Sequence, residues 1–510
     1  MLYVDGISFG PKKVQVSDSP LVPSSTITEL GGKAGKDRHS YNSINVLPDD
    51  VLLEIFDLYV ALPEDYSYPV SEGPELFEDA WHTLIHVCQR WRSVVFASSR
   101  RLHLVLFCTN RRPIKKMLNI WPALPILIYA YSDTSLVRGV TNLLAALKQH
   151  DRVYKINIRG ISNSLLKQFG AMKKPFPELT ELKLRSYHKS APVLPNSFLG
   201  GSTPRLQELF LRGIPFPTLP KLISSMHDLF SLQLWDVPHS GYVSPESMVT
   251  CLSALPNLDL LELSFRSPPS RACKESRRPS PRTPVVLPTL TRFYFGGDRD
   301  YLEDIVSAID IPLLRQLVVR FFNQLTFDTP SLRDFIGRTK TFKSPYRASV
   351  QFRDGSVQVT IYWTHAMKNS QISLGVSCKP SDWQVWSLKQ FWGSSLSPLL
   401  TLETLEISEY REHWHDDTQI AQWLELLRPF TSVKNLVLHK KMVQLVTPAL
   451  QILAQESPKE ALPALEKLSL RGPQPSGPVK EAIEGFVATR QLSGHLVAVD
   501  HVDVGDSQMY

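Results

Sequence analysis

The sequence of 510 residues contains no run of eighteen apolar residues, although 43% of its residues are hydrophobic. A membrane-spanning helix needs about 20 consecutive apolar residues, so none is expected. The first residues, Met1 to Lys13, also lack the charged start and apolar core of a signal peptide. These absences predict a soluble, non-secreted protein without a membrane partner.

Cysteine is scarce. Five cysteines stand at positions 88, 108, 251, 273 and 378, without any paired spacing typical of metal sites or disulfide frameworks. The sequence also contains no Asn-x-Ser/Thr glycosylation acceptor. Both absences fit a reducing compartment, so we expect a cytoplasmic or nuclear location.

Catalytic motifs are missing as well. The sequence has no Gly-x-Ser-x-Gly, no His-Glu-x-x-His, no Cys-x-x-Cys and no dinucleotide fingerprint. The one metal-like cluster, His413-Trp414-His415-Asp416-Asp417, follows a charged stretch and precedes a predicted helix, which favours a capped loop over a metal site. We therefore expect that the protein is not an enzyme and that it binds no cofactor and no metal.

Two segments lack the periodicity of folded elements. Residues 1–43 carry few apolar residues, which predicts a disordered leader. Residues 266–284 hold six basic residues against Glu275 and are rich in Pro and Ser, which predicts a disordered basic loop. This loop is either a regulatory or nuclear-address segment, whose Ser-Pro and Thr-Pro steps suit phosphorylation, or an unselected insertion. No recognition element accompanies the basic charge, so we do not expect a nucleic-acid partner.

Two helical segments stand out near the N-terminus. The first opens at Leu47-Pro48-Asp49-Asp50, where proline suits a first helical turn and the acids favour the positive end of the helix dipole. Its apolar residues share one helical face: Leu52, Ile55, Phe56 and Tyr59. The second segment has a wide apolar stripe: Trp81, Leu84, Ile85, Cys88, Trp91 and Val95. Two short helices cannot bury all of this between themselves, so part of it is expected to meet another protein.

These segments resemble an F-box, through Leu-Pro, then Ile-Phe, then Leu-x-x-Val-Cys-x-x-Trp-Arg. The resemblance implies that residues 44–105 form a helical unit that docks on the Skp adaptor, and through it on a cullin, in an SCF ubiquitin ligase. The matching positions are Leu47, Pro48, Leu52, Ile55, Phe56, Leu84, Val87, Cys88 and Trp91. Some of them face the adaptor and some close the F-box, and the sequence does not separate the two groups. A Pro-rich and acidic stretch, residues 62–79, is longer than the usual connection of the family.

A repeat of the form Pro-x-Leu-x-x-Leu-x-Leu takes over from about residue 121. The first apolar positions of its copies are 153, 179, 206, 229, 258, 290, 314, 402, 433 and 465. Most steps are 23 to 32 residues, which is the period of leucine-rich repeats, and helix-like segments lie between many copies. The copies resemble degenerate leucine-rich repeats, because the Asn typical of the family is replaced in several of them. The resemblance implies an α/β fold class, in which residues 106–510 form an irregular solenoid of strand-plus-helix units.

The gap between the copies at 314 and 402 has a different pattern. Residues 349–361 alternate around Asp354-Gly355, which is the strongest short hairpin signal, and residues 371–377 suit a third strand. We therefore predict a β-hairpin region at residues 345–378 that interrupts or extends the solenoid. A helix near residues 479–490 and a strand at residues 495–502 are predicted to close it.

The phase of the repeats also predicts which side chains face the open, concave side of the sheet, because successive strand residues point to opposite faces. These are Arg159, Arg185, Arg212, Trp235, Ser264, Gly296, Arg320, Ser408, His439 and Arg471. We predict a substrate-binding surface for an acidic or phosphorylated segment at Arg159, Arg185, Arg212, Trp235 and Arg320. In the alternative interpretation each arginine only stacks on the sheet and pairs with a nearby carboxylate such as Glu181 or Glu208.

The two resemblances together imply the substrate-recognition subunit of an SCF-type E3 ubiquitin ligase. The F-box would bind the Skp adaptor, and the repeats would hold a substrate protein for a partner enzyme. The alternative is a non-catalytic repeat scaffold that binds one partner without ubiquitination, its helical pair acting as an N-terminal cap. The sequence does not name the substrate.

Overall fold

The computed structural model describes residues 47–60, 83–97, 104–108, 114–120, 125–131, 137–267, 284–322, 328–343, 345–363, 370–378, 381–394, 401–410, 420–456 and 462–502. The chain divides into two units, residues 1–52 and 53–510. Four predicted segments lie wholly or mostly outside the described residues: the leader at 1–43, the F-box connection at 62–79, the basic loop beyond Ser267, and the cluster from His413 to Asp417.

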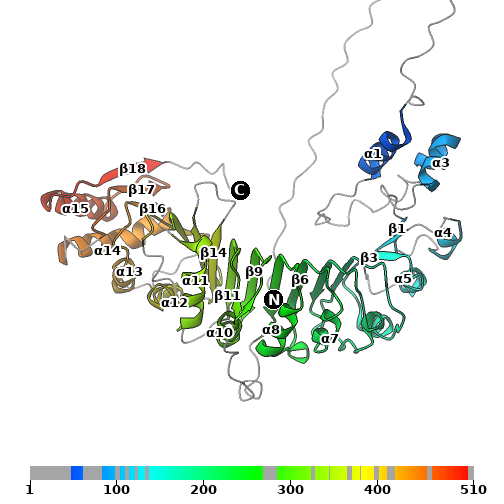
Figure 1. The fold of residues 1–510 in the computed structure, drawn as a ribbon. Coiled ribbons are helices and arrows are strands. Elements are labelled where there is room, and N and C mark those ends of the chain that lie inside the picture. The colour runs from blue at the N-terminus through cyan, green and yellow to red at the C-terminus, as the bar shows by residue number, and fades with distance from the viewer. Residues whose placement is uncertain are drawn as a thin grey trace, which may run out of the picture. The chain divides into compact units, whose positions relative to one another are not determined.

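Two helices occupy the segments that resemble an F-box (Figure 1). Helix α1 (Asp49–Val60) begins directly after Pro48, whose carbonyl accepts a hydrogen bond of 3.1 Å from the Leu52 amide. Helix α3 (Gln89–Ala97) follows a short helical stretch at residues 83–87. The rings of Phe56 and Trp91 connect the two helices, with 4.7 Å between their centroids.

Sixteen of the described strands form one sheet. In their spatial order they are β1 (Leu104–Phe107), β2 (Ile126–Tyr131), β3 (Val153–Arg159), β4 (Glu181–Arg185), β5 (Glu208–Arg212), β6 (Ser231–Val237), β7 (Leu260–Phe265), β9 (Arg292–Gly297), β11 (Gln316–Phe321), β14 (Gln371–Ser377), β13 (Ser356–Tyr362), β12 (Arg347–Arg353), β15 (Thr404–Glu409), β16 (Asn435–His439), β17 (Lys467–Arg471) and β18 (Ala498–Val502). A separate pair is formed by β8 (Val285–Val286) and β10 (Ile309–Asp310).

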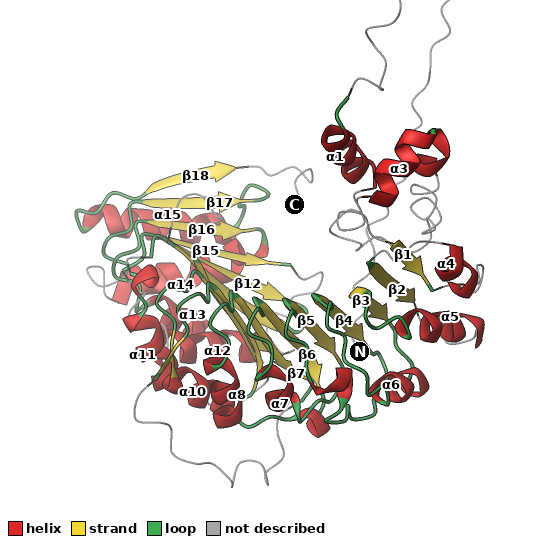
Figure 2. Ribbon diagram, turned by 45° about the vertical axis from the view of Figure 1, so that its right-hand side comes forward, coloured by secondary structure: helices red, strands yellow, loops and turns green. Residues whose placement is uncertain are grey.

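Helices connect many of these strands and lie along one face of the sheet (Figure 2). They are α4 (Ile114–Ile120), α5 (Val137–Leu147), α6 (Asn163–Gly170), α7 (Leu219–Ile223), α8 (Pro245–Ser253), α10 (Arg299–Ala308), α11 (Pro330–Arg338), α12 (Ser381–Ser394), α13 (Ile420–Leu427), α14 (Lys441–Glu456) and α15 (Pro478–Leu492). Side-chain caps start several of them: the oxygens of Ser162, Ser244 and Asp298 accept hydrogen bonds from helix amides. The opposite face of the sheet, which we call the inner face, carries no helix layer in the described part of the chain.

The core lies between the sheet and its helices, where the repeat places its apolar residues. All ten predicted copies contain a strand of the sheet. The first apolar residue of each copy is almost completely buried: Val153, Leu179, Leu206, Leu229, Leu258, Leu290, Leu314, Leu402, Val433 and Leu465. A mixed α/β fold with a long, mainly parallel sheet is thus present, and it is compatible with a leucine-rich-repeat solenoid.

The predicted hairpin is part of this sheet. Strands β12 and β13 pair antiparallel, with Val350 opposite Val359, and Asp354 and Gly355 form the turn between them. Gly355 has a φ of 136°, a backbone conformation that side-chain-bearing residues rarely adopt. The predicted third strand is β14, which pairs antiparallel with β13 and parallel with β11. The hairpin therefore extends the sheet without a break between β11 and β15.

Several elements were not predicted. Strands β1 and β2 join the sheet before the first copy of the repeat. Helix α14 is 16 residues long although Pro448 lies inside it, and a proline normally indicates a helix end. None of the described helices combines the length and the apolar character needed to span a bilayer.

Candidate binding surface

The inner face is built from alternate residues of the strands. In β4, Leu182 and Leu184 are fully buried toward the helices, whereas Glu181, Lys183 and Arg185 are partly exposed on the other side. The same alternation in neighbouring strands aligns inner-face residues in rows across the sheet. The chemistry of this surface is therefore fixed by every second strand residue.

The predicted arginine row is aligned in the structure. Arg159 lies opposite Arg185, Arg185 opposite Arg212, and Arg212 opposite Trp235. Directly opposed residues on neighbouring strands have their Cβ atoms about 5 Å apart, so the three guanidinium groups share one small region. Like charges this close repel one another unless anionic or stacking partners compensate.

Aromatic rings supply part of that compensation. The Arg185 guanidinium lies 4.5 Å from the centroid of the Phe210 ring, and the Arg212 guanidinium lies 5.6 Å from Trp235 and 5.9 Å from Tyr187. Stacking restrains the planar guanidinium groups while their N–H edges remain able to donate. Two arginines of the row are thus held in place before any ligand arrives.

Polar side chains add further restraints. Arg185 donates to Asn157 Oδ1 at 3.3 Å, and Arg212 Nε donates to Asp236 Oδ2 at 2.8 Å. Asp236 has a φ of 51°, and it lies where the pairing of β6 with β7 shifts register. Aspartate tolerates this left-handed conformation better than most residues do. The bulge therefore places one carboxylate at the arginine row.

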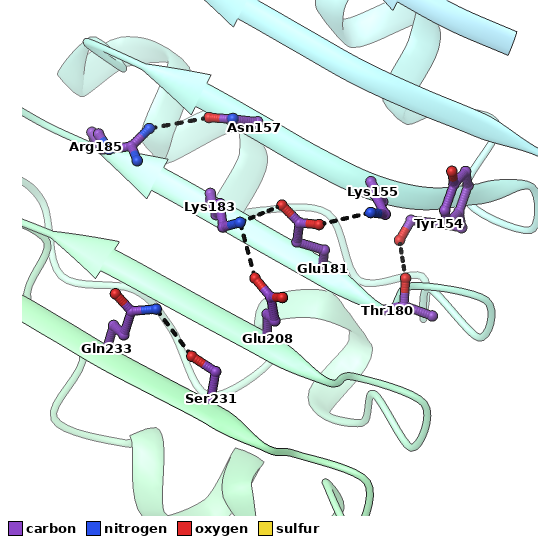
Figure 3. A network of polar contacts seen from close by, with 10 residues as sticks. All are labelled: Tyr154, Lys155, Asn157, Thr180, Glu181, Lys183, Arg185, Glu208, Ser231 and Gln233. Atoms are coloured by element: carbon purple, nitrogen blue, oxygen red, sulfur yellow. Dashed lines mark hydrogen bonds and ion pairs between the residues drawn. The ribbon is translucent and has the colours of Figure 1, made fainter. Parts of the chain in front are cut away.

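Glu181 and Glu208, the carboxylates named in the alternative interpretation, form ion pairs with lysines (Figure 3). Glu181 lies 3.0 Å from Lys155 and 2.6 Å from Lys183, and Lys183 lies 2.9 Å from Glu208. Burial alone would raise the pKa of Glu181, but the hydrogen bonds and charges of the two lysines outweigh burial and lower it. The expected carboxylate partners of the arginines are thus engaged in a neighbouring lysine network, and Arg212 uses Asp236 instead.

A groove occupies the middle of the inner face and has a volume of about 610 Å³. Its lining includes Trp235, Glu262, Gly296, Arg320, Arg353 and Gln358. Arg320 lies opposite Gly296 on β9 and opposite Gly375 on β14, so neither neighbour covers it, and its side chain is exposed. Burial raises the pKa of Glu262, against smaller opposing effects of Trp235 and of the Arg320 charge.

A third group, which was not predicted as a site, surrounds Glu406 on β15. Arg347 pairs with Glu406 Oε2, while His439 Nε2 and Arg471 Nη1 lie 2.6 Å and 3.5 Å from Oε1. Burial would raise the pKa of Glu406, but the hydrogen bonds and charges of His439 and Arg347 lower it to about 2. One ionised carboxylate therefore holds two arginines and a histidine from three other strands.

The other predicted inner-face residues fall into different environments. Ser264 lies opposite Gly296, where an added Cβ atom would come within 2.8 Å of Ser264 Oγ, so any larger residue at position 296 would require Ser264 to shift. His439 and Arg471 lie opposite each other beside Glu406. Ser408 also belongs to the inner face, since it lies opposite Gln351, which lines the groove, but its side chain is buried and its hydroxyl donates to the Val350 carbonyl at 3.4 Å.

The nine residues that match the F-box separate by exposure. Leu52, Phe56 and Leu84 are buried, and Leu47, Cys88 and Trp91 are half-buried. Pro48, Ile55 and Val87 are exposed. Four further large apolar residues outside the matching set are also exposed: Val51, Leu58, Tyr59 and Phe96. In residues 53–97 the helices thus present several large apolar side chains to solvent.

Sequence reasoning had missed Leu58, Phe96, Asp236 and Glu406 as candidate residues. A signal existed for Leu58, which follows Ile55 at helical spacing, and for Glu406, which alternates with the buried Leu405 and Ile407. In the described part of the chain no group of three His, Cys, Asp or Glu residues could hold a metal ion.

Comparisons with known proteins add little detail. No protein-family model matches the chain, and no curated protein matches it. Among solved structures, the chain is similar to the leucine-rich repeat-containing protein LegL7 from Legionella pneumophila, with 13% sequence identity and a TM-score of 0.26. That match covers 76% of this chain and 97% of the other. The fold described above is leucine-rich-repeat-like, and such a fold suggests protein binding.

Proposed function

We propose that this chain is the substrate-recognition subunit of an SCF-type E3 ubiquitin ligase. Its helical segment would bind the Skp adaptor, and through it a cullin, while the inner face of the sheet holds a substrate protein. The reaction itself would be carried out by a partner enzyme. The observation that carries the proposal is the set of exposed apolar side chains on α1 and α3, in a segment that resembles an F-box.

The exposure pattern supports two roles within this segment. Phe56 and Trp91 pack together and hold the two helices in contact. Ile55, Leu58 and Val87 are 39%, 78% and 53% exposed, and they would meet the adaptor. A helical pair that served only as a cap would be expected to bury these side chains.

Co-purification with a Skp adaptor tests the proposal. Leu58→Asp should lower adaptor binding at least about tenfold, because it places a charge where an apolar contact is expected. Leu496→Asp is the matched control, since Leu496 is also 78% exposed but lies near β18. Adaptor binding that is absent from the unmodified chain, or equal in both variants, would favour the scaffold alternative.

The substrate side of the proposal concerns the arginine row. Changing Arg159, Arg185 and Arg212 together to Gln should weaken binding of a glutamate-rich peptide at least about tenfold and reduce its salt dependence. Adaptor binding should not change. The matched control removes the same charge outside the inner face, at Arg205, Arg333 and Arg428. Equal peptide affinity of the two triple variants in an anisotropy titration would contradict the proposed role of the row.

A further inference from the structure

The central groove contains an arginine that the neighbouring strands leave accessible. Arg320 lies between two glycines, acts on Glu262 through its charge, and has an exposed side chain. A Cβ atom at position 375 would contact the Arg320 stem at 3.8 Å, so the absence of side chains there clears one side of it. A guanidinium approached in this way can donate two parallel hydrogen bonds to one anionic group.

The charges around the groove favour a particular anion. Arg320 and Arg353 are exposed, and Arg353 is oriented by a hydrogen bond of 2.8 Å to Gln351 Oε1. Glu262 lines the same groove. A carboxylate with one negative charge meets less repulsion from Glu262 than a phosphate, which carries nearly two.

The sheet also fixes the distance from this groove to the arginine row. Four strand steps separate Arg212 on β5 from Arg320 on β11. At about 4.8 Å per step they span about 19 Å. An extended peptide covers about 3.3 Å per residue, so this distance corresponds to about six residues.

We infer that the inner face binds one extended acidic peptide segment running across the strands, with a carboxylate on Arg320 about six residues from the anionic group held by Arg185 and Arg212. This inference rests on the proposed role of the inner face in substrate binding. It assigns the central groove as a second acidic subsite. It also gives the spacing of the two acids in the recognised segment.

Anisotropy titrations of the full chain with labelled peptides test the spacing. Each peptide is a Gly/Ser chain with two glutamates three, six or nine positions apart. The six-residue spacing should bind about fivefold more tightly than the other two, as for ion pairs at exposed sites. Arg320→Gln should remove this preference, while Arg333→Gln, which removes an equal charge from α11, should retain it.

The inference would be overturned by equal affinity for all spacings, by a preference that survives Arg320→Gln, or by tighter binding when phosphoserine replaces the second glutamate. Tighter binding of a single-stranded oligonucleotide than of any peptide would also overturn it. Failure of the proposed function looks different. If adaptor binding is lost but the spacing preference remains, only the ligase role is contradicted. If Arg320→Gln has no effect on peptide binding while the arginine-row variant weakens it, only the spacing is contradicted.

Discussion

Replacing Trp91 with alanine should lower binding of the Skp adaptor by about two orders of magnitude or more. The Trp91 ring packs at 4.7 Å on Phe56 and joins α3 to α1. Truncation of a packed tryptophan costs about 3 to 5 kcal/mol, and two short helices have little other packing that could compensate for this loss. Binding of the purified variant to a Skp adaptor, measured by calorimetry, reports the change.

A surface substitution separates packing from docking. Ile55→Asp leaves the Phe56–Trp91 contact in place, since the Ile55 side chain is exposed, yet it should weaken adaptor binding as well. Circular dichroism verifies that both variants keep their helices. If the adaptor still binds both variants in a folded chain, the F-box interpretation is wrong.

The second large effect is expected for stability, at Glu406. Glu406→Ala should lower the free energy of unfolding by about 3 kcal/mol, because it leaves Arg347, His439 and Arg471 without their common carboxylate. Urea denaturation followed by tryptophan fluorescence measures the loss. Glu178→Ala removes a carboxylate from an exposed pair with Arg205, and it should change the free energy by no more than about 0.5 kcal/mol.

The same residue predicts a pH dependence. The folded-state pKa of Glu406 is about 2, below its ordinary value of 4.5, so ionised Glu406 stabilises the fold above pH 4.5. This contribution, about 3 kcal/mol, is lost as the pH falls from about 4.5 to about 2. Glu406→Gln should flatten the decrease in stability over that range. A variant that loses stability with acid as steeply as the unmodified chain would contradict the assignment.

The strands and their phase could be predicted because burial follows a local rule. Each repeat copy must bury its last two apolar residues, as Ile156 and Ile158 do in β3, and alternation then assigns the residue that follows, Arg159, to the opposite face. The hairpin was predictable for a similar reason, since Asp354-Gly355 and the alternation around it lie within about a dozen residues. Helix α14 was not predicted, because Pro448 normally indicates a helix end. Burial of apolar residues both before and after Pro448 in the sequence nevertheless keeps the segment helical.

The partners of charged residues could not be predicted in this way. Glu406 meets Arg347 across 59 residues of sequence, because the hairpin places β12 beside β15. Asp236 reaches Arg212 through a shift in strand register, for which the sequence carries no clear signal. The exposure of Ile55 and Val87 likewise depends on how α1 and α3 pack, since helical spacing alone also places the buried Leu52 and Phe56 among the apolar residues.

The hairpin has a consequence for how the chain orders itself. Strands β12 and β13 are joined by two residues, whereas 22 residues separate the parallel neighbours β4 and β5. Closing the longer connection costs about 2 kcal/mol more in chain entropy, and hairpins form within microseconds. The middle of the sheet, rather than either end, is therefore where an unfolded chain can align strands at the lowest entropic cost. Parallel strands can then add outward in both directions.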